Sequence, residues 1–497
     1  LIPFMKVCSC IPALFAATAV FGEPAKPNFL FIFTDDQSYE TVAAHGNAEI
    51  STPHMDRLSE NGVSFTNAYN MGGWGGAICV ASRTMMITGR TIWRARRAVG
   101  SLEEAADRGE LWPQLLENAG YETYFTGKWH VDIDPERIFQ HHVHERPGMP
   151  ADQRTSKRRR GIPMGPDFYE DVPGYLRPVE GKLDPWSPYA QSFGGFWEGG
   201  KHWSEVLADD ATGFLDQAAQ SEKPFFMYLA FNAPHDPRQA PKRFVDLYRR
   251  KDIRIPASYQ PEYPYKDSIG CSPVLRDEAL APFPRTEYAV KTHRQEYYAI
   301  LSHMDEQIGR ILKALDASGK RNNTYVILSS DHGLACGNHG LMGKQNMYEH
   351  SLKPPLILVG PDLPENERRD ALVYLQDIMA TTLDLAGVDK PAYVEFRSLL
   401  PLMRNTSKAH DGYDAVYGAY LEDAQRMIRK GNMKLIVYPR AKKVRLFDLK
   451  ADPNEIRDLS GNPEHWATVV SMFEDLLAQQ AALEDDLRLA DVFPELL

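Results

Sequence analysis

The hydrophobic residues of the chain gather in four continuous apolar runs, and a polar cluster follows each run directly. The runs cover residues 28–33, 121–125, 225–231 and 325–328. Continuous rather than alternating apolar residues are typical of strands that are buried on both faces of a parallel sheet. The clusters that follow are Thr34-Asp35-Asp36, Thr126-Gly127-Lys128-Trp129-His130, Asn232-Ala233-Pro234-His235 and Ser329-Ser330-Asp331-His332-Gly333.

Helical patterns lie between these runs. Thr52-Pro53 predicts the start of a helix and Gly62 its end. Further helices are predicted over residues 112–118, which Gly120 ends, and over residues 297–315, where apolar residues recur at helical spacing. Alternating strands and helices indicate a wound α/β sheet, in which ligands bind beyond the carboxyl ends of the strands. We therefore expect the four polar clusters to form one shared site.

The chain is expected to fold as a catalytic domain over residues 23–400 and a smaller C-terminal subdomain over residues 401–497. Residues 132–203 are rich in Pro, Gly and aromatic side chains without a clear period, which indicates a long insertion near the site. In the C-terminal part, apolar runs at 433–438 and 444–449 predict an antiparallel pair of strands. A final helix is expected around residues 469–477.

Composition and the first residues narrow the class of protein. A net charge of −11 over 497 residues argues against a whole-protein attraction to nucleic acid or to an anionic membrane. Met5-Lys6, the apolar stretch 7–21 and the small residue Gly22 predict a signal peptide over residues 1–22. That stretch is too short to span a bilayer comfortably, so export without stable membrane insertion is expected.

Three cysteines, Cys79, Cys271 and Cys336, remain after the predicted signal peptide. So few cysteines in so long an exported chain do not make a disulfide scaffold. At most one disulfide could form, between Cys271 and Cys336. The presence of Cys79 would then require another explanation.

The polar clusters contain the groups of a metal site. Asp35, Asp36 and Asp331 are carboxylates that repel one another unless a cation neutralises them, and His332 stands beside the last of them. Mostly oxygen ligands favour a hard divalent cation such as Ca²⁺. Positive charge and titratable nitrogens at the same edge indicate an anionic substrate and proton transfer to a leaving group. These come from Lys128, His130, His235 and Lys344.

The most specific motif is Cys79-Val80-Ala81-Ser82-Arg83 with the ending Thr88-Gly89-Arg90. A five-residue cysteine pattern alone is more often a buried structural cysteine at a helix start. Here it stands in order with Asp-Asp, Gly-Lys-Trp-His, Ala-Pro-His, Ser-Asp-His-Gly, and a closing Leu446-Phe447-Asp448-Leu449 with Asp452-Pro453. From Asn28 to about Asp458 the chain resembles the type I sulfatase family of the alkaline-phosphatase-like superfamily.

This resemblance implies an α/β fold with a large, mixed but mostly parallel sheet between helices. A smaller C-terminal α+β subdomain would carry an antiparallel sheet. It also implies that a dedicated maturation enzyme oxidises Cys79 to formylglycine, whose hydrated aldehyde attacks sulfur. Two positions depart from the commonest pattern of the family: Ala81 stands where Pro is commoner, and His332 stands where many members carry Asn.

The resemblance also implies a role for each candidate residue. One Ca²⁺ per chain would be held by Asp35, Asp36, Asp331, His332 and the oxygen derived from Cys79. Arg83 would anchor the modified residue, while Lys128 and Lys344 would bind sulfate oxygens. His235 would protonate the departing alcohol, and His130 would assist the release of sulfate.

The stretch Pro234 to Pro241 looks like that of exported bacterial sulfatases that act on polysaccharides. Arg238 and His339 are candidates for contacts with sugar groups, and the alternative for each is a salt bridge or a loop hydrogen bond. The expected activity is therefore removal of sulfate from a sulfated carbohydrate by a periplasmic or secreted bacterial enzyme. Two alternatives stay open: a phosphodiesterase or phosphonate hydrolase of the same superfamily, and a catalytically silent glycan-binding homologue.

Overall fold

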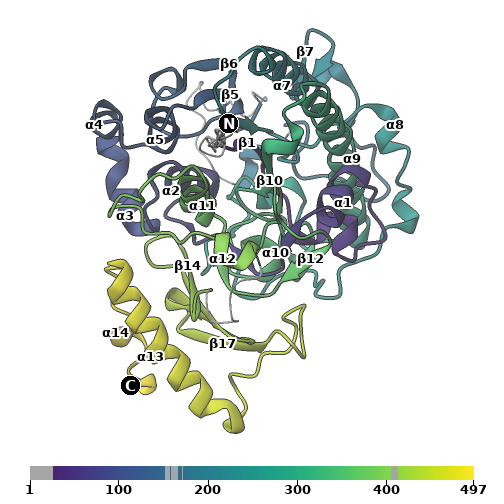
Figure 1. Cartoon of the computed structure of the whole chain (residues 1–497). Coiled ribbons are helices and arrows are strands. Elements are labelled where there is room, and N and C mark those ends of the chain that lie inside the picture. Colours follow the sequence, from purple (N-terminus) through teal and green to yellow (C-terminus); the bar gives the residue numbers. More distant parts are fainter. Residues whose placement is uncertain (1–25, 151–156, 158–165, 171, 405–411) are drawn as a thin grey trace, which may run out of the picture.

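The computed structural model describes residues 26–497, except residues 151–156, 158–165, 171 and 405–411. The predicted signal peptide, residues 1–22, lies outside the described residues. A large sheet surrounded by helices forms most of the molecule, and a smaller sheet with one long helix lies at one end (Figure 1). Among the described residues, no helix combines the length and the apolar character that crossing a membrane requires.

The large sheet has eight strands in the order β12-β2-β11-β10-β1-β9-β5-β6. The four predicted strands are its centre: β1 (Asn28–Thr34), β5 (Glu122–Lys128), β9 (Phe225–Ala230) and β10 (Thr324–Ser330). They pair in parallel, and all but one of their residues are buried. The other strands are β2 (Val63–Phe65), β6 (His141–Arg146), β11 (Leu356–Val359) and β12 (Glu367–Arg369), of which β11 runs antiparallel to β10 and β2. The prediction of a mixed, mostly parallel sheet is confirmed.

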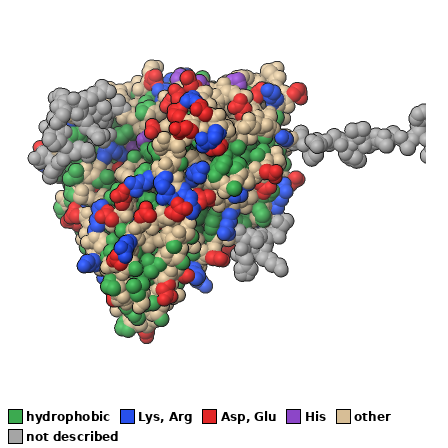
Figure 2. All heavy atoms as spheres, turned by 90° about the vertical axis from the view of Figure 1, so that its left-hand side faces the viewer, with side chains coloured by type: hydrophobic (Ala, Val, Ile, Leu, Met, Phe, Trp, Pro, Cys, Tyr) green, Lys and Arg blue, Asp and Glu red, His purple; other side chains and the backbone are tan. Residues whose placement is uncertain are grey.

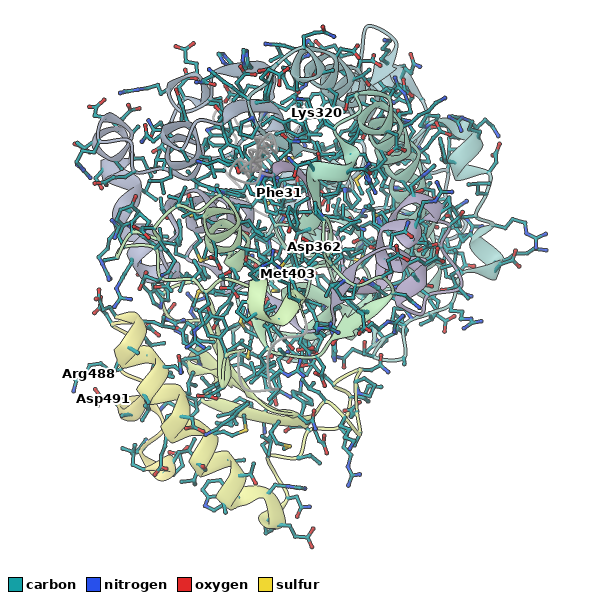
Figure 3. All side chains as sticks on the ribbon, viewed as in Figure 1. Phe31, Lys320, Asp362, Met403, Arg488 and Asp491 are labelled. Atoms are coloured by element: carbon teal, nitrogen blue, oxygen red, sulfur yellow. The ribbon has the colours of Figure 1, made fainter. Side chains whose placement is uncertain are left out.

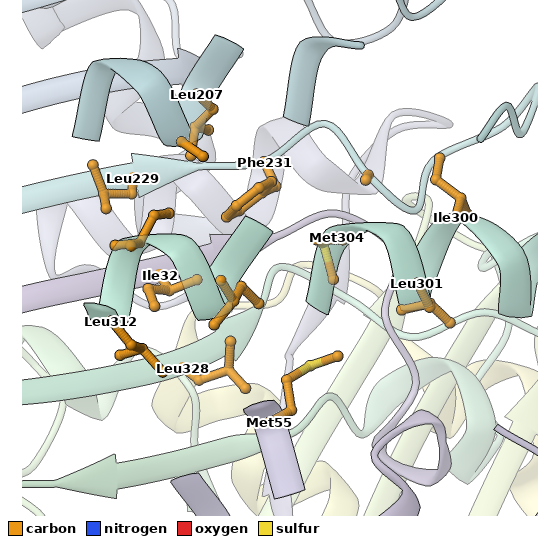
Figure 4. Packing of buried hydrophobic residues seen from close by; sticks show 14 of the residues in the cluster. Ile32, Met55, Leu207, Leu229, Phe231, Ile300, Leu301, Met304, Leu312 and Leu328 are labelled. Atoms are coloured by element: carbon orange, nitrogen blue, oxygen red, sulfur yellow. The ribbon is translucent and has the colours of Figure 1, made fainter. Parts of the chain in front are cut away.

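Side chains that alternate along β1 supply two separate cores, one on each face of the sheet. Leu30 and Ile32 point into the core formed with α1 (Pro53–Glu60), α7 (Trp203–Ala219), α8 (Lys242–Val245) and α9 (Glu287–Ala317). In Figure 4, Ile32, Leu229 and Leu328 of the strands face Met304 and Leu312 of α9.

The opposite face of the sheet packs its aromatic residues against a second set of helices. Phe31, fully buried between sheet and helices (Figure 3), lies in the core with Trp112. Helices that contribute to this core are α2 (Ile78–Thr88), α4 (Leu102–Asp107), α5 (Trp112–Asn118), α11 (Asp377–Leu385) and α12 (Leu400–Met403). The predicted helix over 112–118 is confirmed, and the helix predicted over 297–315 is the middle of the longer α9.

The smaller sheet has the order β17-β16-β15-β14-β4. Its strands are β14 (Ala415–Tyr420), β15 (Gln425–Lys430), β16 (Met433–Tyr438), β17 (Lys443–Asp448) and β4 (Gly72–Gly73), and β16 and β17 form the predicted antiparallel pair. The final helix α13 (Trp466–Leu483) is longer than predicted, and α14 (Leu489–Val492) follows it. Because β4 comes from the catalytic part of the chain and pairs with β14, the two predicted domains share this sheet.

The remaining α-helices and strands of the described residues are short. They are α3 (Ile92–Ala98), α10 (Glu349–Leu352), the parallel pair β3 (Ala68–Tyr69) and β13 (Val373–Tyr374), and the antiparallel pair β7 (Trp197–Glu198) and β8 (Lys201–His202). On the face that carries α3 to α5, positive and negative side chains are interspersed (Figure 2). At the C-terminal end, Arg488 and Asp491 form an ion pair of 3.0 Å (Figure 3).

The described part of the insertion at 132–203 differs from the expectation of a segment without period, because it contains the edge strand β6. The side chains of β6 are mostly exposed, so the strand lacks the apolar run that made the buried strands visible in the sequence.

Cys79, Cys271 and Cys336 are all buried free thiols. The bridge between Cys271 and Cys336 that the sequence left open is not formed in this structure.

Candidate active site

The carboxyl ends of β1, β5, β9 and β10 meet at one edge of the large sheet, and the start of α2 faces them. Ligand atoms of Asp35, Asp36, Cys79 and Asp331 lie within 4.8 Å of one another, and all four side chains are buried. The backbone N–H of Asp36 donates to Asp331 Oδ1 at 3.2 Å, which links the two strand ends directly. Asp36 has a φ of 66°, a left-handed conformation that costs energy for a residue with a Cβ and is often found at functional sites.

The three carboxylates repel one another in this dry environment. Burial and the neighbouring Asp331 carboxylate raise the pKa of Asp35 well above its ordinary value. Burial raises the pKa of Asp36 to about 6, against the opposing effect of the Lys344 ammonium. A divalent cation would relieve this repulsion, and a donor set of carboxylate oxygens suits a hard cation such as Ca²⁺. The residues present therefore fit a metal site.

Two lysines place their ammonium groups against the carboxylates. Lys344 Nζ lies 2.6 Å from both carboxylate oxygens of Asp36 and 3.2 Å from Cys79 Sγ. Lys128, the last residue of β5, forms a fully buried ion pair with Asp35. Although burial disfavours the charged amine, the Asp36 carboxylate raises the pKa of Lys344 well above its ordinary value. Positive charge is thus held next to Cys79 at neutral pH.

Cys79 is the second residue of α2 and lies one turn before Arg83 in this helix. Its Sγ is 3.5 Å from Asp35 Oδ1. Burial raises the pKa of the Cys79 thiol far above its ordinary value, although Lys128 and Lys344 oppose this rise. The unmodified side chain is therefore a neutral thiol at pH 7 and a poor nucleophile.

Both predicted catalytic histidines line the cavity above Cys79, which has a volume of about 530 Å³. His235 Nδ1 lies 2.6 Å from the carbonyl oxygen of Asp236, so its Nε2 faces the site, 3.8 Å from Asp36 Oδ2. His130 has a left-handed φ of 60°, and a Cβ on Gly148 would lie 2.3 Å from its ring. Burial lowers the pKa of His130 to about 3 and holds that of His235 well below its ordinary value. Both rings are therefore neutral at pH 7.

His332 is fully buried at the end of β10, but its ring nitrogens do not lie within the four-residue group. Its Nδ1 is 3.1 Å from the carbonyl oxygen of Gly333, and no hydrogen-bond partner is described for its Nε2. An unpartnered buried nitrogen is available to a ligand, so its role as a metal ligand stays a prediction.

Arg238 and His339 lie away from the lining of the Cys79 cavity. Arg238 is 2% exposed, and its guanidinium lies over the ring of Tyr297 at 5.2 Å. The ring of His339 stacks on Tyr348 at 3.7 Å, and its Nδ1 is 3.2 Å from His350 Nε2. Both side chains are engaged in packing within the protein, and their contact with a sugar stays a prediction without support from these positions.

Met149, Arg276 and Asp277 are among the lining residues of the cavity that belong to none of the sequence motifs. Met149 comes from the segment 132–203 and lines the cavity. Arg276 and Asp277 come from a loop between β9 and α9 that carries no periodic or motif signal. Their position could not be read from the sequence, because it depends on how this loop packs against the residue after His235.

The buried carboxylates and Cys79 lie together at one edge of a mixed, mostly parallel sheet. Comparison with known proteins identifies the family to which this fold and site belong. The chain matches the sulfatase family over residues 27–388 and therefore belongs to the sulfatase family. Residues 337–482 match a second family, which describes the C-terminal region of N-sulphoglucosamine sulphohydrolase.

Two named relatives cover most of the chain. An arylsulfatase of Clostridium perfringens is 28% identical over an alignment of 464 positions that covers 88% of this chain and 91% of that protein. An N-acetylglucosamine-6-O-sulfatase of Bacteroides thetaiotaomicron is 25% identical over an alignment of 507 positions that covers 89% of this chain and 84% of that protein.

Two solved structures share the fold. A protein in complex with its substrate D-glucosamine-2-N,6-O-disulfate superimposes with a TM-score of 0.67 at 23% identity, covering 93% of this chain and 99% of that one. A phosphonate monoester hydrolase of Agrobacterium radiobacter superimposes with a TM-score of 0.69 at 19% identity, covering 92% and 96%. The fold alone therefore does not separate sulfate from phosphonate chemistry, whereas the family match makes this chain a sulfatase.

Proposed function

We propose that this sulfatase removes sulfate from a sulfated carbohydrate, with a formylglycine derived from Cys79 and one Ca²⁺. The observation that carries the proposal is the convergence of Cys79 with three buried carboxylates and the Lys344 ammonium. A thiol with a raised pKa is unsuited to attack, and thiolate sulfur is a soft ligand for a hard cation. Conversion of this side chain to an aldehyde, whose hydrate supplies a nucleophilic oxygen at a metal, would remove both difficulties.

Asp35, Asp36 and Asp331 would hold the cation, with His332 as a further candidate. Arg83 supports this group because its Nε donates to Asp331 Oδ2 at 2.9 Å. Burial by itself would raise the pKa of Asp331, but the Arg83 guanidinium holds that pKa below its ordinary value. One of the predicted ligands therefore stays ionised even without a metal.

Lys128 and Lys344 would bind the sulfate oxygens and the charge that develops on them. His235 would donate a proton from Nε2 to the oxygen of the leaving alcohol, since its Nδ1 is occupied by the carbonyl oxygen of Asp236. A bound sulfate next to His235 would raise its depressed pKa and so favour the protonated form that this step needs. His130, on the same cavity wall, would assist the release of sulfate.

A carbohydrate substrate is supported by the relatives and by the cavity itself. One relative acts on N-acetylglucosamine-6-O-sulfate, and a similar structure holds a sulfated glucosamine. A cavity of about 530 Å³ is large enough for a sugar unit. Export to the periplasm or medium, with removal of a signal peptide at residues 1–22, would place the enzyme next to polysaccharides. A formylglycine-generating enzyme would be its maturation partner.

The test is co-expression with a formylglycine-generating enzyme, followed by assays on glucosamine 6-sulfate, on sulfated algal and animal oligosaccharides, and on phosphate diesters. We expect release of sulfate from at least one sugar, and none from the matched Cys79→Ala variant. A dominant phosphodiesterase activity would overturn the proposal in favour of the phosphonate hydrolase alternative. Binding of a glycan without turnover of any sulfate ester would favour the silent alternative.

A further inference from the structure

Arg276, on the wall of the Cys79 cavity, contacts the residue that follows His235. Its guanidinium forms an ion pair with the carboxylate of Asp236, which is fully buried. His235 Nδ1 lies 2.6 Å from the backbone oxygen of Asp236 and 3.9 Å from its carboxylate Oδ1. The charge of Asp236 is therefore next to the imidazole that faces the substrate, and Arg276 is the cation paired with it.

The contacts of Arg276 continue to the segment that carries Lys344. Its second guanidinium nitrogen donates to Asp277 Oδ1 at 2.6 Å, and Asp277 Oδ2 accepts from Gln345 Nε2 at 2.8 Å. The side-chain oxygen of Gln345 in turn accepts from the backbone N–H of Lys344 at 3.0 Å. A continuous series of polar contacts thus joins His235 to Lys344 around the rim of the site.

The loops that carry these residues are tightly packed. A Cβ on Gly343 would lie 2.4 Å from Gln345 Oε1 and 2.7 Å from Asp277 Cβ. The side chain of Arg276 is only 11% exposed, so its two ion pairs are shielded from water on most sides. Such a network holds its members in one geometry, and removal of one charge leaves a buried partner without compensation.

We propose that Arg276 is a positioning residue for proton donation by His235. With Arg276 in place, the Asp236 carboxylate is directed toward the guanidinium, and His235 Nδ1 keeps its bond to the backbone oxygen. Without Arg276, the unpaired carboxylate is free to take the Nδ1 proton of His235 as its own partner, which turns Nε2 away from the leaving group. This inference rests on the proposed sulfatase mechanism and adds to it a residue outside the sequence motifs.

A positioning role for the proton donor has a signature that a general structural role lacks. Protonation helps most when the leaving oxygen is basic and least when it leaves readily as an anion. Loss of Arg276 should therefore slow sulfate esters of poor leaving groups much more than 4-nitrophenyl sulfate. Phenyl sulfate is the matched probe, because it has nearly the same size and shape but a more basic leaving oxygen.

The experiment compares Arg276→Gln and Arg276→Lys with the wild type on 4-nitrophenyl sulfate, phenyl sulfate and glucosamine 6-sulfate, with Arg310→Gln as a surface control. Arg310 pairs with Asp209 on the exterior, where its side chain is 45% exposed. For Arg276→Gln we expect kcat to fall about 100-fold on phenyl sulfate and glucosamine 6-sulfate, and only a few-fold on 4-nitrophenyl sulfate. Arg276→Lys should fall between, and His235→Ala should show the same dependence on the leaving group.

Equal losses on all three substrates in a folded variant would overturn the inference, and so would a rise in KM with kcat unchanged, which would make Arg276 a substrate contact. Thermal unfolding and circular dichroism establish that each variant is folded. If Arg276→Gln does not fold, Arg276→Lys, which keeps the charge, carries the comparison. Failure of the proposed function itself is distinguishable, because the wild type would then hydrolyse none of the sulfate esters.

Discussion

Arg83 and Asp331 form an ion pair of 2.9 Å in which neither side chain is exposed to solvent. Arg83 belongs to α2 and Asp331 follows β10, so the pair fixes the helix of Cys79 to the sheet edge that carries the carboxylates. The same guanidinium donates to the carbonyl oxygen of Lys128 at 2.8 Å and lies over the ring of Phe33 at 4.8 Å. One side chain thus connects the helix that carries Cys79 with the ends of three strands.

We expect Arg83→Met to lower the free energy of unfolding by about 3–5 kcal/mol, because it leaves the Asp331 carboxylate buried and unpaired. Arg83→Lys should also destabilise, since a single ammonium cannot reach both Asp331 and the Lys128 carbonyl as the guanidinium fork does. Urea unfolding measures the change, and Arg254→Met, at a position that is 81% exposed, is the control. An Arg83→Met protein as stable as the control would contradict the view that this pair supports the site.

Replacement of Cys79 should separate activity from stability. Cys79→Ser and Cys79→Ala are expected to reduce turnover below detection when produced with the maturation enzyme, while the melting temperature changes by only a few degrees. Mass analysis of the peptide that contains Cys79 should show an aldehyde in the wild type. Cys336→Ala, which removes another buried free thiol, is the matched control and should keep its activity. Turnover by Cys79→Ala comparable to that of the wild type would refute the nucleophile assignment.

Metal removal should affect stability as well as activity. Treatment of the protein with EDTA is expected to abolish turnover and lower the melting temperature, and added Ca²⁺ should restore both. A cation present at about 100 times its dissociation constant would stabilise the native state by about 2.7 kcal/mol. In Asp36→Asn, one of the predicted ligand charges is lost, so the rise in melting temperature on addition of Ca²⁺ should shrink. A Ca²⁺ shift that is the same in wild type and Asp36→Asn would place the ion elsewhere.

The sequence predicted which polar residues would meet in space where they follow directly on a buried strand. Asp35, Lys128 and Asp331 stand at or next to the ends of apolar runs, and parallel pairing brings such ends to one edge whatever the loops do. The helix that carries Cys79 begins at Ile78, and its start faces that edge. Its motif lies close in sequence to the first strand, which makes this position possible. These positions depend on local patterns and on the general geometry of α/β sheets.

The remaining features depend on contacts between distant segments that leave no local pattern. Arg276 contacts Asp236 from 40 positions away, through a loop without regular structure. Strand β4, only two residues long and composed of glycine, joins a sheet formed by the C-terminal part of the chain. His339 and Arg238 show the limit of reasoning from position next to a motif: their side chains pack against Tyr348 and Tyr297, and their predicted contact with a sugar stays a prediction.

Asp305 of α9 makes a pH-dependent contribution to stability away from the active site. Its carboxylate accepts hydrogen bonds from the backbone N–H groups of His54 at 3.1 Å and Met55 at 2.8 Å, in the first turn of α1. Burial nevertheless raises the pKa of Asp305 to about 7, although these two hydrogen bonds oppose the rise. An aspartate in an unfolded chain has a pKa of about 4, so the native state binds the proton more tightly than the unfolded state.

The sign of the effect follows from this difference. The contribution of Asp305 to stability is complete below about pH 4 and is lost as the pH rises through about 7, because the unfolded state has by then released its proton and the native state must do so too. Asp305→Asn cannot titrate and should lack this loss, although it costs about 1 kcal/mol or more for one of the two helix-capping hydrogen bonds. In urea unfolding at pH 5 and pH 8, the wild type should lose more stability between the two values than Asp305→Asn, by about 1–3 kcal/mol. Asp316→Asn, at a side chain that is 65% exposed, should follow the wild type. If wild type and Asp305→Asn lose the same stability between pH 5 and pH 8, the carboxylate of Asp305 is ionised throughout that range, and its two helix-capping hydrogen bonds outweigh its burial.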